Sequence, residues 1–141
     1  MSSTDKITKP RVGDQLQPLI ITPTHAQLFM FSAVTWNRHP IHYSQQAAKS
    51  EGHADVLVQR GLIGNFFARM LLEAFPETAE IKRLNWKVLK SAVPGEKLNC
   101  HGEILSFEDT EAGWLADCKI AIVKQDNLPV ATGQARVAYC R

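Results

Sequence analysis

VLVQRGLIGNFFARMLLEAF, residues 56–75, is a long and mainly apolar run near the middle of the chain. Large apolar side chains recur every four residues from Leu62, and a second set follows one position later from Ile63. This spacing is typical of a helix with a wide apolar face. We expect the helix to begin near Gly61 and to end before Pro76, because proline cannot continue a helix.

After this run, apolar and polar residues alternate with the period of half-buried β-strands. The alternation covers four segments, residues 83–88, 97–104, 114–122 and 130–139. Pro94-Gly95 and Asp126-Asn127 supply turn residues between segments. The pattern predicts four antiparallel strands that follow one another as a meander.

The residues before the apolar run predict one strand and two helices. Residues 16–21 are predicted to form the first strand. Thr24 and Gln27 have the spacing of a capping box, and residues 28–34 are apolar nearly all round, so we expect a helix buried on most sides. Residues 45–51 predict a short surface helix.

A chain of 141 residues can bury a long apolar helix only by curving an antiparallel sheet around it. We therefore predict an α+β hot-dog fold, in which a curved antiparallel sheet wraps around a long central helix. Residues 1–13 are predicted to be a flexible tail, and residues 14–141 a single domain. Because such a sheet has a free edge, a homodimer or higher oligomer is expected.

The composition excludes several classes of protein. The 16 basic and 14 acidic residues give a net charge of +2 and form no block of like charge, so no nucleic-acid partner is expected. Cys100, Cys118 and Cys140 are odd in number and lack a Cys-x-x-Cys spacing, which argues against disulfides and a thiolate zinc site. No signal-peptide pattern and no apolar run of about 20 residues is present, so we expect a cytoplasmic protein with no membrane partner.

The sequence WNRHPIHY, residues 36–43, is the best candidate for a functional site. Pro40 fixes its own φ and favours an extended conformation at His39, so Asn37, His39 and His42 should project from defined, non-helical backbone. In an alternative interpretation, these side chains only cap a helix and satisfy backbone groups. His39 and His42 lack a third ligand at a recognised spacing, so no metal site is predicted. No Gly-x-Ser-x-Gly or Walker motif is present, which argues against serine hydrolysis and nucleotide hydrolysis.

The stretch FSAVTWNRHPIH, residues 31–42, resembles the signature of the MaoC-like (R)-specific enoyl-CoA hydratases and dehydratases, usually Gly-Asp-x-Asn-Pro-[Leu/Ile]-His. The final Pro-Ile-His matches. Asn37 stands where that family has its catalytic Asp, His39 stands in place of Asn, and Trp36 in place of Gly. The Asn-x-His-x-Ile-His-Tyr version is similar to a branch with mesaconyl-type hydratases and mitochondrial 3-hydroxyacyl-thioester dehydratases.

Two further segments extend the resemblance to roughly residues 14–140. Residues 56–72 resemble the Val-His-Gly-Leu segment of the family, with Arg60 in place of His, and residues 91–98 resemble its Pro-Gly-Asp-x-Leu turn. The resemblance implies a hot-dog fold, activity on acyl thioesters in fatty-acid or steroid side-chain metabolism, and no cofactor beyond the coenzyme A thioester that serves as substrate.

Hydration of an α,β-unsaturated thioester needs a base that takes a proton from water and an acid that protonates Cα. It also needs hydrogen-bond donors that stabilise the enolate oxygen. His42 is the predicted base, since neutral imidazole accepts protons near neutral pH. Asn37 can orient the water, but an amide does not exchange protons as a carboxylate does. Either His42 carries both proton transfers, or His39 assists, or the activity is weak or absent.

The N-H of Gly61, at a helix start, is the predicted donor to the thioester oxygen. In the alternative interpretation, Gly61 only forms the turn by which the chain enters the helix. Arg60, Lys87 and Lys90 are the predicted substrate-binding cations, which would meet the phosphates of the carrier unless they form only a solvated face.

The leading hypothesis is a hydro-lyase that hydrates a trans-2-enoyl-CoA, or dehydrates the matching 3-hydroxyacyl thioester, on coenzyme A or acyl carrier protein. Its pocket would be shared across a dimer. The alternative is a non-catalytic hot-dog subunit that completes the acyl pocket of a MaoC-like partner. A thioesterase would need an acidic or serine nucleophile, and the loop offers neither.

Overall fold

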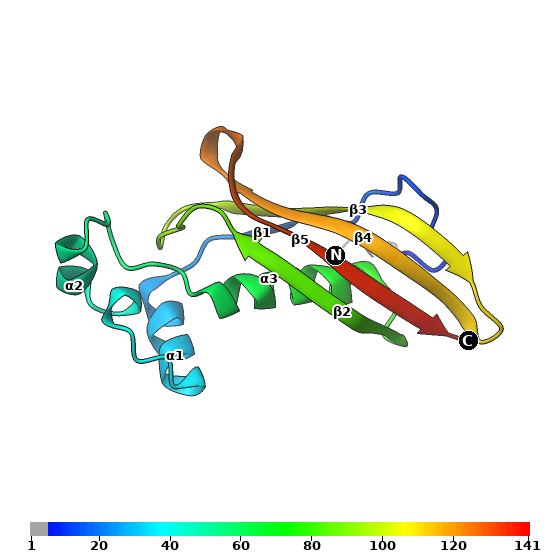
Figure 1. Ribbon diagram of the computed structural model, residues 1–141, viewed down its shortest axis with the longest axis horizontal. Helices are drawn as coiled ribbons and strands as arrows, with labels where there is room; N and C mark the ends of the chain where they lie inside the picture. Colours follow the sequence, from blue (N-terminus) through cyan, green and yellow to red (C-terminus); the bar gives the residue numbers. More distant parts are fainter. Residues whose placement is uncertain (1–5) are drawn as a thin grey trace.

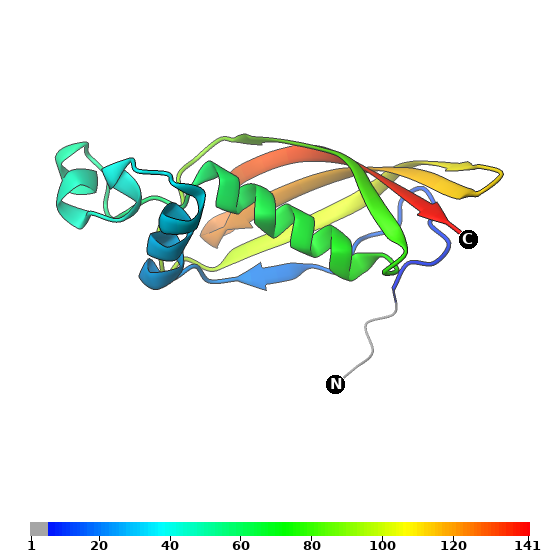
Figure 2. The same ribbon diagram turned by 90° about the horizontal axis from the view of Figure 1, so that it is seen from below.

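A computed structural model describes residues 6–141. Its elements are β1 (Leu19–Ile21), α1 (His25–Thr35), a 3₁₀ turn (Pro40–His42), α2 (Gln45–Ser50), α3 (Arg60–Ala74), β2 (Ala79–Val88), β3 (Leu98–Asp109), β4 (Gly113–Lys124), a second 3₁₀ turn (Gln125–Asn127) and β5 (Leu128–Cys140). The five strands form one antiparallel sheet in the order β1-β3-β4-β5-β2. The sheet curves over α3, while α1 and α2 lie together at one end (Figures 1 and 2). The predicted curved sheet around a central helix is confirmed.

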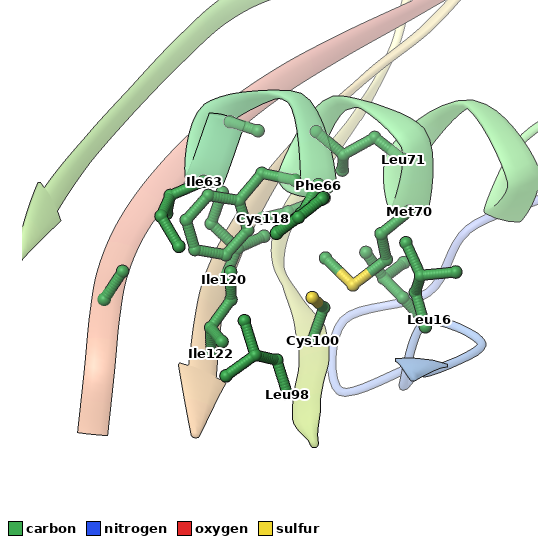
Figure 3. Packing of buried hydrophobic residues seen from close by; sticks show 14 of the residues in the cluster. Leu16, Ile63, Phe66, Met70, Leu71, Leu98, Cys100, Cys118, Ile120 and Ile122 are labelled. Atoms are coloured by element: carbon green, nitrogen blue, oxygen red, sulfur yellow. The ribbon is translucent and has the colours of Figure 1, made fainter. Parts of the chain in front are cut away.

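The central helix α3 begins and ends where its sequence pattern predicts. It runs over Arg60–Ala74 and is closed by Phe75, one residue before Pro76. Its apolar face, represented in Figure 3 by Ile63, Phe66 and Met70, packs on side chains of β3 and β4. Burying each large apolar side chain contributes roughly 1.5–3 kcal/mol, so the many buried side chains of this face stabilise the fold strongly.

The order of the strands corrects one prediction. β3, β4 and β5 form the expected meander, but β2 pairs with β5 at the far edge of the sheet, with Leu84 opposite Ala135. Residues 89–97 carry the chain from that edge across to β3, beside β1. A local alternation of polar and apolar residues specifies a strand but not its neighbour, which is why the meander prediction was wrong for β2.

Helix α1 is capped as predicted but is much more exposed than predicted. Thr24 Oγ1 accepts a hydrogen bond from Gln27 N at 3.1 Å. Only Leu28 and Ser32 are buried in this helix. The helix lies at the end of the sheet, so only one of its faces has a partner (Figure 2). The prediction of burial on most sides was therefore wrong. The most exposed apolar side chains of α1 are Phe29 (61%), Met30 (63%) and Val34 (84%).

The segment predicted to be a flexible tail lies partly outside the described residues, at positions 1–5. Residues 6–13 run against the rest of the chain. Ile7 N donates to Ala74 O at 2.8 Å, and Trp114 Nε1 donates to Thr8 O at 3.2 Å. These bonds attach the segment to α3 and β4.

The three cysteines are free thiols. Burial raises the pKa of Cys100 and of Cys118 to about 12, so both are neutral groups of the core. Within residues 6–141, no helix has the length and apolarity needed to cross a bilayer. In the same residues, no three His, Cys, Asp or Glu side chains are grouped so as to hold a metal ion.

Candidate active site

The loop that carries the candidate residues begins at a left-handed turn. Trp36 closes α1 with φ 58° and ψ 29°, and the N-H groups of Trp36 and Asn37 both donate to Ser32 O. A positive φ is unusual for a bulky side chain, and it suits the Gly that the resembled signature has here. His39 then adopts φ −67° and ψ 119°, the extended conformation predicted for the residue before Pro40.

His42 is the best-held side chain of this loop. It is half-buried, and its Nδ1 lies 2.7 Å from Leu57 O. A carbonyl oxygen only accepts, so Nδ1 carries the hydrogen and Nε2 of the neutral ring keeps its lone pair. Leu57 N donates in turn to Ile41 O at 2.9 Å, which fixes the two segments side by side. The ring is therefore held in one orientation, and its Nε2 has no hydrogen-bond partner within residues 6–141.

His39 and Asn37 are partly occupied by the backbone of their own loop. Asn37 Oδ1 accepts from His39 N at 3.3 Å, and His39 Nδ1 accepts from Ile41 N at 3.4 Å. The backbone-capping interpretation thus holds for these two contacts. The neutral His39 ring then carries its hydrogen on Nε2 and can donate from there. Its ring centroid lies 6.0 Å from that of His42.

The start of α3 presents free backbone donors. Thr24 and Ser44 cap α1 and α2 through side-chain oxygens, but the N-cap residue Gln59 makes no such bond. Gly61 is exposed, and its N-H has no hydrogen-bond partner within residues 6–141. The first N-H groups of a helix carry its positive partial charge. This end of α3 can therefore receive a negatively charged oxygen.

Gly61 is also closely packed on one side. A Cβ at this position would lie 3.2 Å from Cζ of Phe31, which comes from α1. Gly61 follows Leu57 by four residues, so their Cα atoms lie no more than about 14 Å apart. The Leu57 carbonyl that orients His42 and the Gly61 N-H thus belong to one short segment.

Arg60 is engaged in a structural contact. Its guanidinium lies 5.3 Å above the Trp86 ring, and its Nη2 donates to Trp86 O at 3.3 Å. Trp86 Nε1 returns a bond to Arg60 O at 3.0 Å. This reciprocal contact ties β2 to the first turn of α3. Lys87 and Lys90 are exposed and form no ion pair with another described residue, so both ammonium groups are free.

A second polar cluster fixes the segment that leads to Leu57. Asp55 accepts bonds from Val56 N at 2.7 Å, Gln45 Nε2 at 3.2 Å and His25 Nε2 at 2.9 Å. Burial alone would raise the pKa of Asp55, but these hydrogen bonds lower it below its ordinary value of 3.8. The ionised carboxylate therefore joins the start of α1, α2 and the segment before Leu57. No periodicity or motif marks this cluster in the sequence.

The cavities of the single chain separate the candidate residues. A groove of about 620 Å³ lies along α1 and is lined by Phe31 and by Leu62, the residue after Gly61. A smaller cavity of about 190 Å³ includes Asn37 and Trp36. Neither cavity is lined by His42. His42, His39 and Asn37 thus lie in one loop, and neither of these two cavities encloses them together with Gly61.

Comparison with known proteins decides the family. The sequence model of the family described as hydroxyacyl-thioester dehydratase type 2 matches residues 2–94, which include the loop, the three α-helices, β1 and β2 but not β3, β4 or β5. The chain belongs to the hydroxyacyl-thioester dehydratase type 2 family. The matched region contains every candidate residue from Asn37 to Lys90.

One curated relative of this dehydratase-family chain is 3-hydroxyacyl-[acyl-carrier-protein] dehydratase FERN, mitochondrial, from Solanum lycopersicum. The two are 24% identical over 106 residues, which are 74% of this chain and 63% of the relative. The match thus spans less than two thirds of the relative's own length.

Solved structures of low sequence identity share the fold of this dehydratase-family chain. An (R)-hydratase from A. caviae involved in PHA biosynthesis is 18% identical, with a TM-score of 0.84 over 92% of this chain and 97% of that one. The ChsH1-ChsH2 complex from Mycobacterium tuberculosis is 16% identical, with a TM-score of 0.83 over 94% and 100%. The predicted hot-dog fold is confirmed.

Proposed function

We propose that this chain is a hydro-lyase that adds water to a trans-2-enoyl thioester, or removes water from the matching 3-hydroxyacyl thioester. The observation that carries the proposal is the bond from His42 Nδ1 to Leu57 O, which leaves Nε2 as a free base. Membership of a hydroxyacyl-thioester dehydratase family supports the same reaction class.

In the hydration direction, His42 Nε2 takes a proton from water as the water oxygen bonds to Cβ. The π electrons of the double bond move toward the thioester carbonyl, and negative charge develops on its oxygen. The Gly61 N-H stabilises this oxygen, helped by the positive end of α3. The imidazolium then gives its proton to Cα, so one water is added and His42 returns to its neutral form.

Asn37 and His39 have supporting roles in this proposal. Asn37 Nδ2 makes no hydrogen bond within residues 6–141, so it can donate to the oxygen of the attacking water. His39 Nε2 carries a hydrogen and assists as a donor. Neither side chain replaces the carboxylate of the resembled signature, which is why we assign both proton transfers to His42.

The acyl chain and its carrier would occupy different surfaces. The apolar groove lined by Phe31 and Leu62 suits an acyl chain. Lys87 and Lys90 suit the phosphates of coenzyme A or of the prosthetic group of acyl carrier protein. Replacing both lysines by alanine should raise KM for coenzyme A thioesters more than it lowers kcat.

Hydration in ¹⁸O-labelled water tests the proposal. Purified protein is incubated with crotonyl-CoA and with longer and branched enoyl thioesters, and the products are analysed by mass spectrometry. The label should appear in the hydroxyl group at Cβ of an intact thioester. Label in a free carboxylate would instead identify a thioesterase. No label with any of these substrates would contradict the hydro-lyase proposal for the isolated chain.

A second candidate, a non-catalytic subunit that completes the pocket of a partner, is favoured by one observation. Neither the groove along α1 nor the cavity at Asn37 is lined by His42 or Gly61, and in this candidate a second chain closes the site. One structure with the same fold is a complex named for two chains. A homodimer in light scattering whose turnover is lost in His42→Ala would exclude this candidate.

The cellular location is a separate proposal. The tomato relative is named as mitochondrial, whereas the sequence predicts a cytoplasmic protein. Fractionation of cells that express the full-length protein, followed by immunoblotting, tests this prediction. Recovery in an organelle fraction would contradict it.

A further inference from the structure

Two polar side chains lie in the core where α1 meets the start of α3. Gln59 is 0% exposed and Ser32 is 6% exposed, and no other polar or charged residue among positions 6–141 is buried to this degree. Gln59 Nε2 donates to Leu28 O at 2.7 Å and to Ser32 Oγ at 2.9 Å. One amide group therefore joins the N-terminal end of α3 to two successive turns of α1.

These bonds connect the two halves of the candidate site. The carbonyl of Ser32 accepts the N-H of Asn37 at 3.0 Å, so Ser32 sets where the loop leaves α1. Gln59 follows Leu57, which orients His42, and precedes Gly61 by two residues. The backbone carbonyl of Gln59 accepts a hydrogen bond from Ile63 N at 3.0 Å, the first hydrogen bond of α3. Movement of Gln59 would change the distance between Gly61 and the loop.

The buried side chain of Gln59 costs the folded state free energy, and packing does not explain why a glutamine stands there. Gln59 Oε1 is buried and has no hydrogen-bond partner among residues 6–141. A buried acceptor without a partner destabilises the folded state, and an apolar side chain of similar length would avoid this penalty. Gln59 also leaves the N-terminus of α3 without a side-chain cap. Departures from the most stable choice are typical of functional positions.

We propose that Gln59 is a positioning residue that sets the Gly61 N-H at its working distance from Asn37 and His42. Gln59 touches no substrate and acts only through the α1 and α3 backbone. The inference deepens the proposed hydro-lyase function and rests on it. A displacement of about 1 Å between reacting groups is enough to cost roughly a hundredfold in rate.

The test compares Gln59→Met and Ser32→Ala with wild type in three measurements: turnover of an enoyl thioester, thermal unfolding and amide hydrogen exchange. Gln59→Met removes the unpaired Oε1 but also the donor to Leu28 O and Ser32 Oγ, so these effects offset and Tm should stay close to wild type. At the same time kcat should fall by about tenfold to a hundredfold, while KM stays within about twofold. Ser32→Ala should have a smaller effect, and the double variant should match Gln59→Met, since both remove the same contact. Gln134→Met, at an exposed position on β5, is the matched control.

Hydrogen exchange separates this inference from the proposed function. In Gln59→Met, exchange should increase at residues 36–39 and 59–62 but not in the second half of α3. Unchanged exchange in both segments would overturn the inference, whatever the turnover. A large fall in Tm that accompanies the fall in kcat would also overturn it, because it would show a general structural role. If exchange increases in Gln59→Met as expected but the wild-type protein turns over no enoyl thioester, only the hydro-lyase proposal is contradicted.

Discussion

His42 Nδ1 lies 2.7 Å from the carbonyl oxygen of Leu57. This bond joins the loop after α1 to the segment before α3, and Leu57 N strengthens the pairing through Ile41 O at 2.9 Å. The contact selects one tautomer of the neutral ring, with the hydrogen on Nδ1 and the lone pair on Nε2. The protein thereby prepares His42 to accept a proton before any substrate binds.

The tautomer itself is a testable consequence. In ¹⁵N NMR of histidine-labelled protein, neutral His42 should show a protonated Nδ1 and an unprotonated Nε2, while neutral His39 should show the opposite pattern because its Nδ1 accepts from Ile41 N. Assignment comes from the loss of each signal in the matching His→Ala variant. A protonated Nε2 on neutral His42 would rule out this ring as the base.

Trp36→Gly should stabilise the protein. Trp36 has φ 58°, which costs a bulky L-residue about 1–2 kcal/mol but costs glycine little. The loss of the contact with Arg38, whose guanidinium lies 5.8 Å from the ring centroid, offsets part of the gain. Urea unfolding should show a net increase of about 0.5–1 kcal/mol. Val34→Gly, exposed within α1, is the control and should lose roughly 0.3–0.5 kcal/mol, the difference between valine and glycine in helix propensity. Equal losses in both variants would contradict strain at Trp36.

Gly64→Ala should destabilise the protein through Trp86. A Cβ at Gly64 would lie 2.3 Å from Cζ2 of Trp86, so the indole would have to move and lose its bond to Arg60 O. We expect a loss of about 1–3 kcal/mol in chemical unfolding, together with a changed near-UV circular dichroism signal. Gly61→Ala is the control, since its Cβ would meet only the Phe31 ring at 3.2 Å. Equal stability of Gly64→Ala and wild type would refute this packing.

Glu96 should make stability depend on pH in the acid range. Burial raises its pKa, but hydrogen bonds from Val93 N, Gln125 and Lys124 outweigh burial and hold the pKa below its ordinary value of 4.5. The Glu96 and Lys124 side chains are only 13% and 15% exposed. Because the folded-state pKa is depressed, the contribution is complete above the ordinary value and is lost as the pH falls through the lowered one.

Urea unfolding of Glu96→Gln checks this dependence. Wild type should be more stable than the variant by about 1–3 kcal/mol near pH 7, and the difference should shrink toward about pH 3. Glu111→Gln serves as the control, because Glu111 is exposed and forms no ion pair among the described residues. A difference that stays constant over this range would contradict an ionised Glu96 in the folded state.

Local patterns predicted the elements of this fold well. The four-residue repeat that begins at Leu62 placed α3 correctly, because one helix face packs on the sheet along its whole length. The turn at Pro94-Gly95 was also predicted correctly, and Gly95 has the positive φ of 88° that the turn requires. These features depend on a few neighbouring residues, so the sequence expresses them directly.

Features that depend on distant partners were not predictable in the same way. Val34 is as apolar as a core residue yet 84% exposed, because nothing in the part of the chain that the structure describes covers that face of α1. The pairing of β2 with β5 depends on the path of residues 89–97. The acceptor for His42 is a backbone carbonyl, which leaves no side-chain signal at Leu57, and no periodic pattern identifies the amide of Gln59 as a link between helices.

The most direct test of the proposed chemistry is the initial rate of enoyl-thioester hydration by the isolated protein, followed as the loss of the enoyl-thioester absorbance. The rate is measured for wild type, His42→Ala and His39→Ala. His42→Ala should lose about 10²–10⁴ in kcat/KM, the usual contribution of a general base. His39→Ala should lose less than about tenfold, as expected for an assisting donor. A His42→Ala variant that keeps its rate within about tenfold of wild type would contradict the assignment of His42 as the base.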